Sequence, residues 1–148
     1  MDPELAALLE GFPIIITLPV QWGDQDAFGH VNNTVYFRWF ESARIAYGLR
    51  IGLDRVKAAE NIGPILASIS CHYRRQVTFP DTVHVGARVT RIGRSSLAME
   101  HKLLSEVGRA VAAEATSTLV IFDYNANQSH RVPDSLRQDV ANLEGKGF

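Results

Sequence analysis

The sequence is poor in cysteine, in long apolar runs and in net charge, and each scarcity excludes a class of protein. Cys71 is the one cysteine, so the chain can form neither an intramolecular disulfide nor a cysteine-rich zinc site. The apolar run IIITLPV, residues 14–20, is far shorter than the roughly 20 residues that a membrane-spanning helix needs. A formal net charge of -1 gives no basic surface for nucleic acid. We therefore expect a protein that binds neither nucleic acid nor membrane.

The composition is that of an ordinary globular domain. The chain has 148 residues, of which 46% are hydrophobic and 21% are charged, and it contains no repeat or interdomain linker. We therefore expect residues 1–148 to form a single domain. The first residues lack the basic region, apolar stretch and cleavage site of a secretory signal, and a lone cysteine fits a reducing compartment. On these grounds we expect a cytoplasmic protein.

Residues 34–50 have the periodicity of a helix that needs burial on most of its circumference. Two adjacent apolar stripes run along it. One contains Val35, Trp39, Ser42, Ala46 and Leu49, and the other contains Tyr36, Phe40, Ala43 and Tyr47. The polar residues Arg38, Glu41 and Arg44 are spaced to pair along the remaining face. Such a helix is surrounded by other elements.

The remaining pattern is mostly that of strands. Residues 14–22 are rich in β-branched side chains, and alternation is strong in 65–79, 82–92, 95–105 and 109–123. We expect these last four segments to pair in meander order, with the first strand joining elsewhere. Residues 2–10 and 132–144 predict short terminal helices.

Small residues on the last long strand indicate that the helix packs against this part of the sheet. Ala113, Ala115 and Ser117 share one face and allow a helix to approach closely. We therefore predict an α+β fold, in which a curved antiparallel sheet of about five strands wraps round the long central helix. One sheet covers only one side of that helix, and an uncovered apolar side usually marks a subunit interface. We expect a homodimer or homotetramer.

The stretch WGDQDAFGHVNNTVYFRWFE, residues 22–41, places acidic and polar groups directly before the aromatic helix. A metal site is one interpretation, because Asp24, Asp26 and Gly29 match three positions of a calcium-binding loop. Phe28 and Val35, however, occupy positions where that loop needs oxygen ligands. We therefore predict no metal.

Two further interpretations of this stretch stay open. Asp24, Gln25 and the two asparagines are common in turns and helix caps, and His30 fits a loop residue bonded to backbone as well as a catalytic one. Alternatively, the free N–H groups at the helix start face an upstream carboxylate. A base or nucleophile beside oxyanion donors is the minimum apparatus for acyl transfer.

The same stretch resembles the signature of the hotdog-fold acyl-CoA thioesterases, in the branch of 4-hydroxybenzoyl-CoA thioesterase. The likeness consists of D-x-D-x-x-G, a polar stretch, and an aromatic-rich helix with Glu-x-Ala-Arg near its middle. The order of elements agrees along nearly the whole chain. The Gly-His-Val-Asn-Asn version, residues 29–33, is most similar to the broad acyl-CoA thioesterases and departs from the benzoyl type.

This resemblance implies that Asp26, the second aspartate of D-x-D, is catalytic, either as nucleophile or as the base that activates water. It also implies that backbone amides around Gly29, His30 and Asn33 hold the oxyanion. Glu41 is a second candidate, because a related hotdog branch carries its carboxylate on the helix, but its position between Arg38 and Arg44 favours an ion pair.

The substrate implied by the resemblance is an acyl-CoA, so coenzyme A is part of the substrate and no cofactor is expected. Arg91, Arg94 and Ser95, around a turn between strands, are the favoured contacts for its phosphates. Two other classes remain open: a non-catalytic domain that binds acyl-CoA or an acyl carrier, and a hotdog hydratase or dehydratase.

Overall fold

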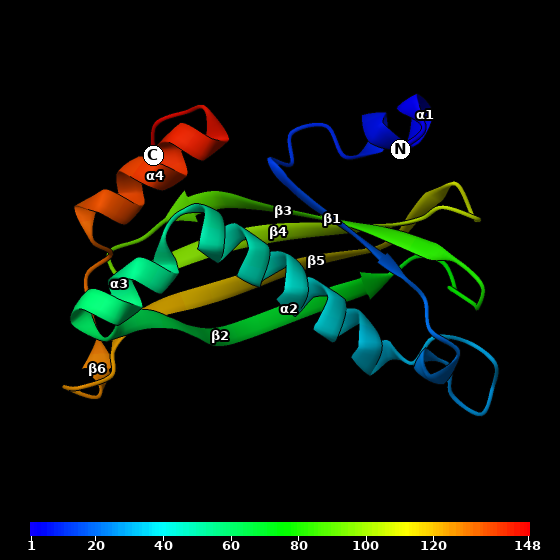
Figure 1. Cartoon of the computed structure of the whole chain (residues 1–148), viewed down its shortest axis with the longest axis horizontal. Helices are drawn as coiled ribbons and strands as arrows, with labels where there is room; N and C mark the ends of the chain where they lie inside the picture. The colour runs from blue at the N-terminus through cyan, green and yellow to red at the C-terminus, as the bar shows by residue number, and fades with distance from the viewer.

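The computed structural model describes residues 1–148 as an antiparallel sheet with a long helix, α2 (Asn33–Arg50), lying along one face (Figure 1). The strands are β1 (Ile14–Pro19), β2 (Ile62–Tyr73), β3 (Thr82–Ile92), β4 (Ser96–Ser105), β5 (Ala110–Asp123) and β6 (Gln128–Ser129). The shorter helices are α1 (Pro3–Leu8), α3 (Leu53–Glu60) and α4 (Asp134–Glu144). The predicted helix wrapped by a sheet is therefore present.

The strand order is β1-β3-β4-β5-β2, with β6 beside β5, so the predicted meander of four strands is wrong. Only β3, β4 and β5 follow one another as hairpins, whereas β2 pairs with β5 at the far edge. Residues 74–81 are too long for a tight hairpin turn, and they carry the chain from the β2 edge back towards β1. This connection leaves β1 and β2 as the two edges of the sheet.

The core lies between α2 and the sheet. Phe40, Ala43 and Tyr47 of α2 are almost completely buried against the inward residues of the strands. Ala113 and Ala115 are buried on β5, as the sequence predicted, whereas the close contacts of α2 are with β3 and β1. Burial of this kind stabilises by about 25 cal/mol for each Å² of apolar surface removed from water.

The two terminal helices pack in different places, and only α4 contributes to this core. The α1 segment forms a separate small cluster with Phe12 and Leu104. At the other end, Glu144 of α4 accepts hydrogen bonds from the Tyr47 hydroxyl at 2.6 Å and from the Val89 amide at 2.9 Å. The helix α3, which the sequence pattern did not predict, follows α2 directly and lies beside the start of β2 (Figure 1).

One side of α2 and the adjoining edge of the sheet stay uncovered. Ile45 and Leu49 of α2 are 59% and 56% exposed, and Ile65 and Leu66 of β2 are 41% and 40% exposed. These residues form the uncovered apolar side expected from the sequence. No helix in the structure combines the length and the apolar character that a membrane span needs.

Candidate active site

The loop before α2 is held by its own backbone. A single 3-10 turn, Trp22–Asp24, follows β1, and the Asp24 carboxylate accepts a hydrogen bond from the Gln21 amide at 2.8 Å. The Asn32 amide donates a hydrogen bond to the Asp24 carbonyl at 2.9 Å. The Asn32 side chain then accepts from the Thr34 amide at 2.9 Å, so Asn32 caps α2. Asp24 and Asn32 thus have the turn and capping roles that the sequence left open for them.

Asp26 lies at the start of a tight turn within this loop. Its amide donates to the His30 carbonyl at 2.9 Å, and its carbonyl accepts from the Gly29 amide at 3.1 Å. Gly29 has a φ of +83°, which favours glycine and allows the chain to reverse there. The Asp26 carboxylate accepts from the Phe28 amide at 2.9 Å and is exposed. In this structure, therefore, Asp26 faces solvent.

The amides expected to hold an oxyanion differ in their availability. The Gly29 amide is used by the turn, whereas the His30 amide donates to no acceptor in the protein. The Asn33 amide stands at the first position of α2, where no intrahelical acceptor exists. His30 and Asn33 together line a cavity of about 240 Å³ beside the helix start.

Two tyrosines and two arginines form much of the rest of that cavity's wall, together with Val31 and Gln76. The Tyr73 hydroxyl donates to the Asn33 carbonyl at 3.1 Å, and the Tyr36 and Tyr73 rings meet edge to face at 5.0 Å. Burial raises the pKa of Tyr36 to about 12 and also raises the pKa of Tyr73, so both hydroxyls stay protonated at neutral pH. Arg74 pairs with Glu114 at 3.2 Å, and Arg75 lines the cavity next to it.

Arg91, Arg94 and Ser95 lie at the other end of the sheet. β3 begins beside the loop that precedes α2 and ends at Ile92, so the turn after it is a full strand length from Asp26 (Figure 1). The Arg91 and Arg94 side chains are exposed. The carbonyl oxygens of Arg94 and Ser95 accept hydrogen bonds from the amides of Val132 and Ile121. The structure therefore does not bring these residues to Asp26 of the same protomer.

A second cavity, of about 410 Å³, lies between the later part of α2, α3 and the start of β2. Glu41 and Arg44 both line it, but they form no ion pair with each other, so the predicted pairing is wrong. Arg44 is 9% exposed because it shares the buried side of α2 with Phe40 and Tyr47, whereas Glu41 is exposed. The spacing of Arg44 from Phe40 and Tyr47 was the available signal of its burial.

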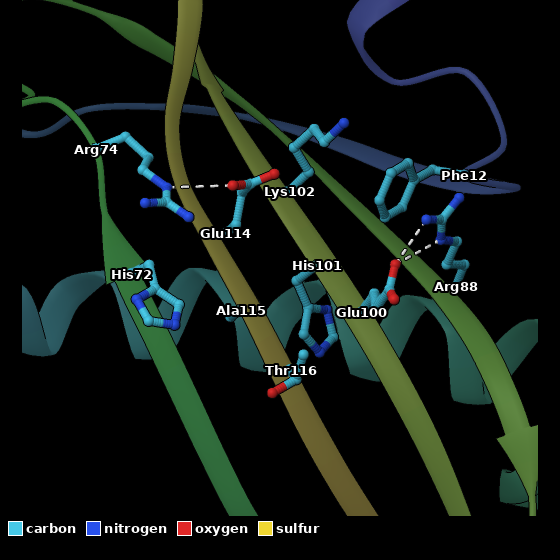
Figure 2. A pocket seen from close by; sticks show the side chains of 10 residues that line it. All are labelled: Phe12, His72, Arg74, Arg88, Glu100, His101, Lys102, Glu114, Ala115 and Thr116. Atoms are coloured by element: carbon cyan, nitrogen blue, oxygen red, sulfur yellow. Dashed lines mark hydrogen bonds and ion pairs between the residues drawn. The ribbon is translucent and has the colours of Figure 1, made fainter.

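A third cavity, of about 310 Å³, is the one that Figure 2 shows, on the sheet face away from α2. Its main charges are already compensated, because Arg74 pairs with Glu114 and Arg88 pairs with Glu100. Phe12 lies under the Arg88 guanidinium at 4.5 Å. Nowhere in the structure do three or more His, Cys, Asp or Glu side chains gather in a way that could hold a metal ion.

A long helix along a curled antiparallel sheet defines the hotdog class of proteins. Comparison with known structures supports this assignment. A thioesterase from Thermus thermophilus, solved with coenzyme A and Zn, is 33% identical with a TM-score of 0.83 over 94% of this chain and 99% of that chain. A putative thioesterase from Pseudomonas aeruginosa, PA2801, is 37% identical with a TM-score of 0.78 over 88% and 99%.

The family model of the thioesterase-like superfamily matches residues 20–140, and the chain belongs to this family of hotdog-fold acyl-CoA thioesterases. The fold class and the resemblance predicted from the sequence are thereby confirmed. The long-chain acyl-CoA thioesterase FadM of Escherichia coli is 23% identical over 118 residues, which are 80% of this chain and 89% of FadM. The uncharacterized protein YsmA of Bacillus subtilis is 29% identical over 90 residues, 61% of this chain, and the matched part spans 60% of YsmA.

Proposed function

We propose that the protein is an acyl-CoA thioesterase, which hydrolyses an acyl-CoA to a free acid and coenzyme A. The observation that carries this proposal is the loop before α2, where the exposed Asp26 carboxylate shares one tight turn with the free amide of His30. The family, and the coenzyme A bound to the similar Thermus thermophilus structure, support it. A protein that only bound acyl-CoA would have no need of a carboxylate beside the thioester.

Two chemical routes satisfy this arrangement. In one, Asp26 takes a proton from water, the resulting hydroxide attacks the thioester carbon, and the proton passes to the departing thiolate. In the other, the carboxylate attacks directly, the thiolate leaves, and water hydrolyses the mixed anhydride. Both routes place a negative charge on the former carbonyl oxygen. The amides of His30 and Asn33 are proposed to hold it, and Gly29 to shape the turn that presents them.

The site is proposed to be completed by a second copy of the chain. β2 is an edge strand with exposed apolar residues, and an edge of this kind pairs readily with another strand. Tyr73, at the end of β2, touches the start of α2, whereas Pro64 and Leu66, at its beginning, line the 410 Å³ cavity. Antiparallel pairing of two β2 strands about a two-fold axis brings the end of one to the beginning of the other. The loop of one protomer then opens towards the cavity of its partner.

The proposed dimer also suggests a role for Arg91, Arg94 and Ser95. They lie at the same end of the sheet as the 410 Å³ cavity and thus at the end that receives the partner's loop. We propose that the two exposed guanidinium groups bind the phosphates of coenzyme A. Raised salt is then expected to increase the KM for acyl-CoA, since it screens exposed charges.

The test measures thiol release from a panel of acyl-CoAs by the purified protein. We expect hydrolysis by the unmodified chain and a loss of at least about 100-fold in kcat for Asp26→Asn, with the fold checked by circular dichroism. Glu41→Gln, the second candidate carboxylate, is measured in the same assay, and a loss confined to Asp26→Asn assigns the reaction to Asp26. Near-normal turnover by a folded Asp26→Asn would rule Asp26 out. Hydration without thiol release, or binding alone, would favour the two other classes.

A further inference from the structure

The 410 Å³ cavity is lined mostly by apolar side chains, but a cation stands in its wall. Its volume falls within the range usual for small-molecule sites. The apolar lining comes from α2, α3 and the first part of β2, namely Ile45, Leu49, Leu53, Pro64 and Leu66, with Leu119 from β5. Arg44 of α2 is the one charged residue of the lining that is buried. Glu41, Asp54 and Lys57 are exposed at its rim.

The Arg44 guanidinium has no partner in the protein. It forms no hydrogen bond and no ion pair, and its Nη1 atom is buried without an acceptor. Burial lowers the pKa of Arg44, yet a guanidinium stays charged at neutral pH. A buried charge normally finds a partner, because leaving it unpaired costs the full free energy of desolvation. An unpaired buried arginine in the wall of an open cavity therefore points to a ligand.

His101, on which the positive charge of Arg44 acts, cannot supply the missing negative charge. His101 of β4 is 2% exposed, and its Nε2 is 2.9 Å from the Ser117 hydroxyl oxygen. Burial first, and then the positive charge of Arg44, lower the pKa of His101 to about 3, so its ring is neutral. Its Nδ1 also lacks a partner. The charge of Glu41, which is exposed at the rim, acts to raise the pKa of Arg44, but the two groups form no ion pair. None of the buried residues in the lining carries a negative charge.

We propose that Arg44 binds a carboxylate at the far end of the acyl chain, so that the preferred substrates are thioesters of dicarboxylic acids. This inference rests on the proposed function and names the substrate class of the same site. The planar guanidinium matches a carboxylate with two parallel hydrogen bonds, and a bound carboxylate neutralises the buried charge. The apolar wall accommodates the methylene groups between the two ends. The thioester then lies towards the β2 edge, where the partner's loop enters.

The experiment compares two substrates of equal length, adipyl-CoA and hexanoyl-CoA, which differ only in the terminal carboxylate. We expect kcat/KM to favour adipyl-CoA by about 10- to 100-fold in the unmodified protein. Arg44→Met should abolish or reverse the preference for adipyl-CoA, mainly through a change in KM. Arg44→Lys should keep part of the preference, because lysine keeps the positive charge but lacks the planar guanidinium. Arg38→Met is the matched control, since Arg38 is exposed on the same helix, and the ratio should not change.

Thermal unfolding gives a second readout that does not need turnover. Adipyl-CoA should raise the Tm of the unmodified protein more than hexanoyl-CoA does, and Arg44→Met should remove the difference. An unmodified protein that favours hexanoyl-CoA overturns the inference. An equal loss on both substrates in Arg44→Met also overturns it, because Arg44 would then serve the fold or a carboxylate of the partner. If no acyl-CoA is hydrolysed but the difference in Tm persists, the proposed function fails and the carboxylate site stands.

Discussion

The hydroxyl of Tyr73 donates a hydrogen bond to the carbonyl oxygen of Asn33 over 3.1 Å, and this contact ties the end of β2 to the first residue of α2. The Tyr73 ring also packs edge-on against Tyr36, one turn further along the helix. Because β2 is a free edge of the sheet, the contact joins the edge that we propose to pair with a second subunit to the loop that carries Asp26. A subunit that pairs along β2 therefore bears directly on the candidate active site.

Tyr73→Phe tests this link. The variant loses one hydrogen bond to a partly exposed carbonyl, so we expect the free energy of unfolding to fall by about 1 kcal/mol. We also expect faster hydrogen exchange at the first amides of α2. Tyr124→Phe is a matched control, because the Tyr124 hydroxyl donates to the Pro64 carbonyl at 2.8 Å, at the other end of β2. Equal exchange at the α2 start in both variants would contradict the link.

The proposed dimer is tested by charge placed on the two edges of the sheet. Ile65→Glu on β2 should give a monomer and strongly reduce hydrolysis, because the interface would bury a charge without a partner. Ile15→Glu on β1 should leave the assembly intact. The pair is well matched, because Ile65 is 41% exposed and Ile15 is 40% exposed. Light scattering after size-exclusion chromatography measures the mass, and a monomer produced by Ile15→Glu alone would point to the wrong edge.

Stability should depend on pH through His101. Its pKa is about 3 in the folded chain against 6.5 in the unfolded chain, so below pH 6.5 the unfolded state binds a proton that the folded state does not. Stability is therefore full above pH 6.5 and declines as the pH falls towards 3. The contribution of this one residue has a slope of at most about 1.4 kcal/mol per pH unit.

His101→Gln keeps a polar group near Ser117 but does not titrate, so its stability should fall less steeply between pH 7 and pH 4 than that of the unmodified protein. Urea unfolding at several pH values measures the two slopes. Arg44 from α2 and Ser117 from β5 face the ring and remain in both proteins. Identical slopes would show that His101 has no part in acid destabilisation.

Gly86 marks a close contact between β3 and the segment that follows α1. A Cβ atom at this position would lie 2.8 Å from Cγ of Phe12, which is nearer than real Cβ contacts allow. We expect Gly86→Ala to lower the free energy of unfolding by about 1–3 kcal/mol. Gly23→Ala is the control, since a Cβ there meets nothing within 4 Å. Urea unfolding measures both, and equal stabilities would mean that Phe12 moves aside without cost.

The sequence predicted those features that depend on neighbouring residues. The helix over residues 34–50 and the burial of Ala113 and Ala115 followed from local periodicity, and the structure has both. The residue types suggested a cap by Asn32 or Asn33, and the structure shows that Asn32 is the cap. The strand order did not follow, because residues 74–81 connect opposite edges of the sheet and alternation says nothing of which strands pair. The short helix α3 was missed because its apolar face is narrow.

The candidate site likewise has parts that the sequence predicted and parts that it did not. Asp26, His30 and Asn33 are close in the chain, so the motif could bring them to one loop, and their chemical roles stay predictions. Arg91 and Arg94 were grouped with them only through the resemblance, and in one protomer they lie at the opposite end of the sheet. Arg44 was predicted to pair with Glu41, but α3 and the start of β2 enclose it instead.

What the sequence by itself determined is the set of elements and the family, because side-chain period and a short motif are properties of consecutive residues. What only the tertiary structure decided is the pairing of the strands, the free edge at β2, and the burial of one arginine without a partner. These depend on contacts between segments far apart in the chain. Their free energy comes from packing and desolvation in the folded molecule, which no local pattern records.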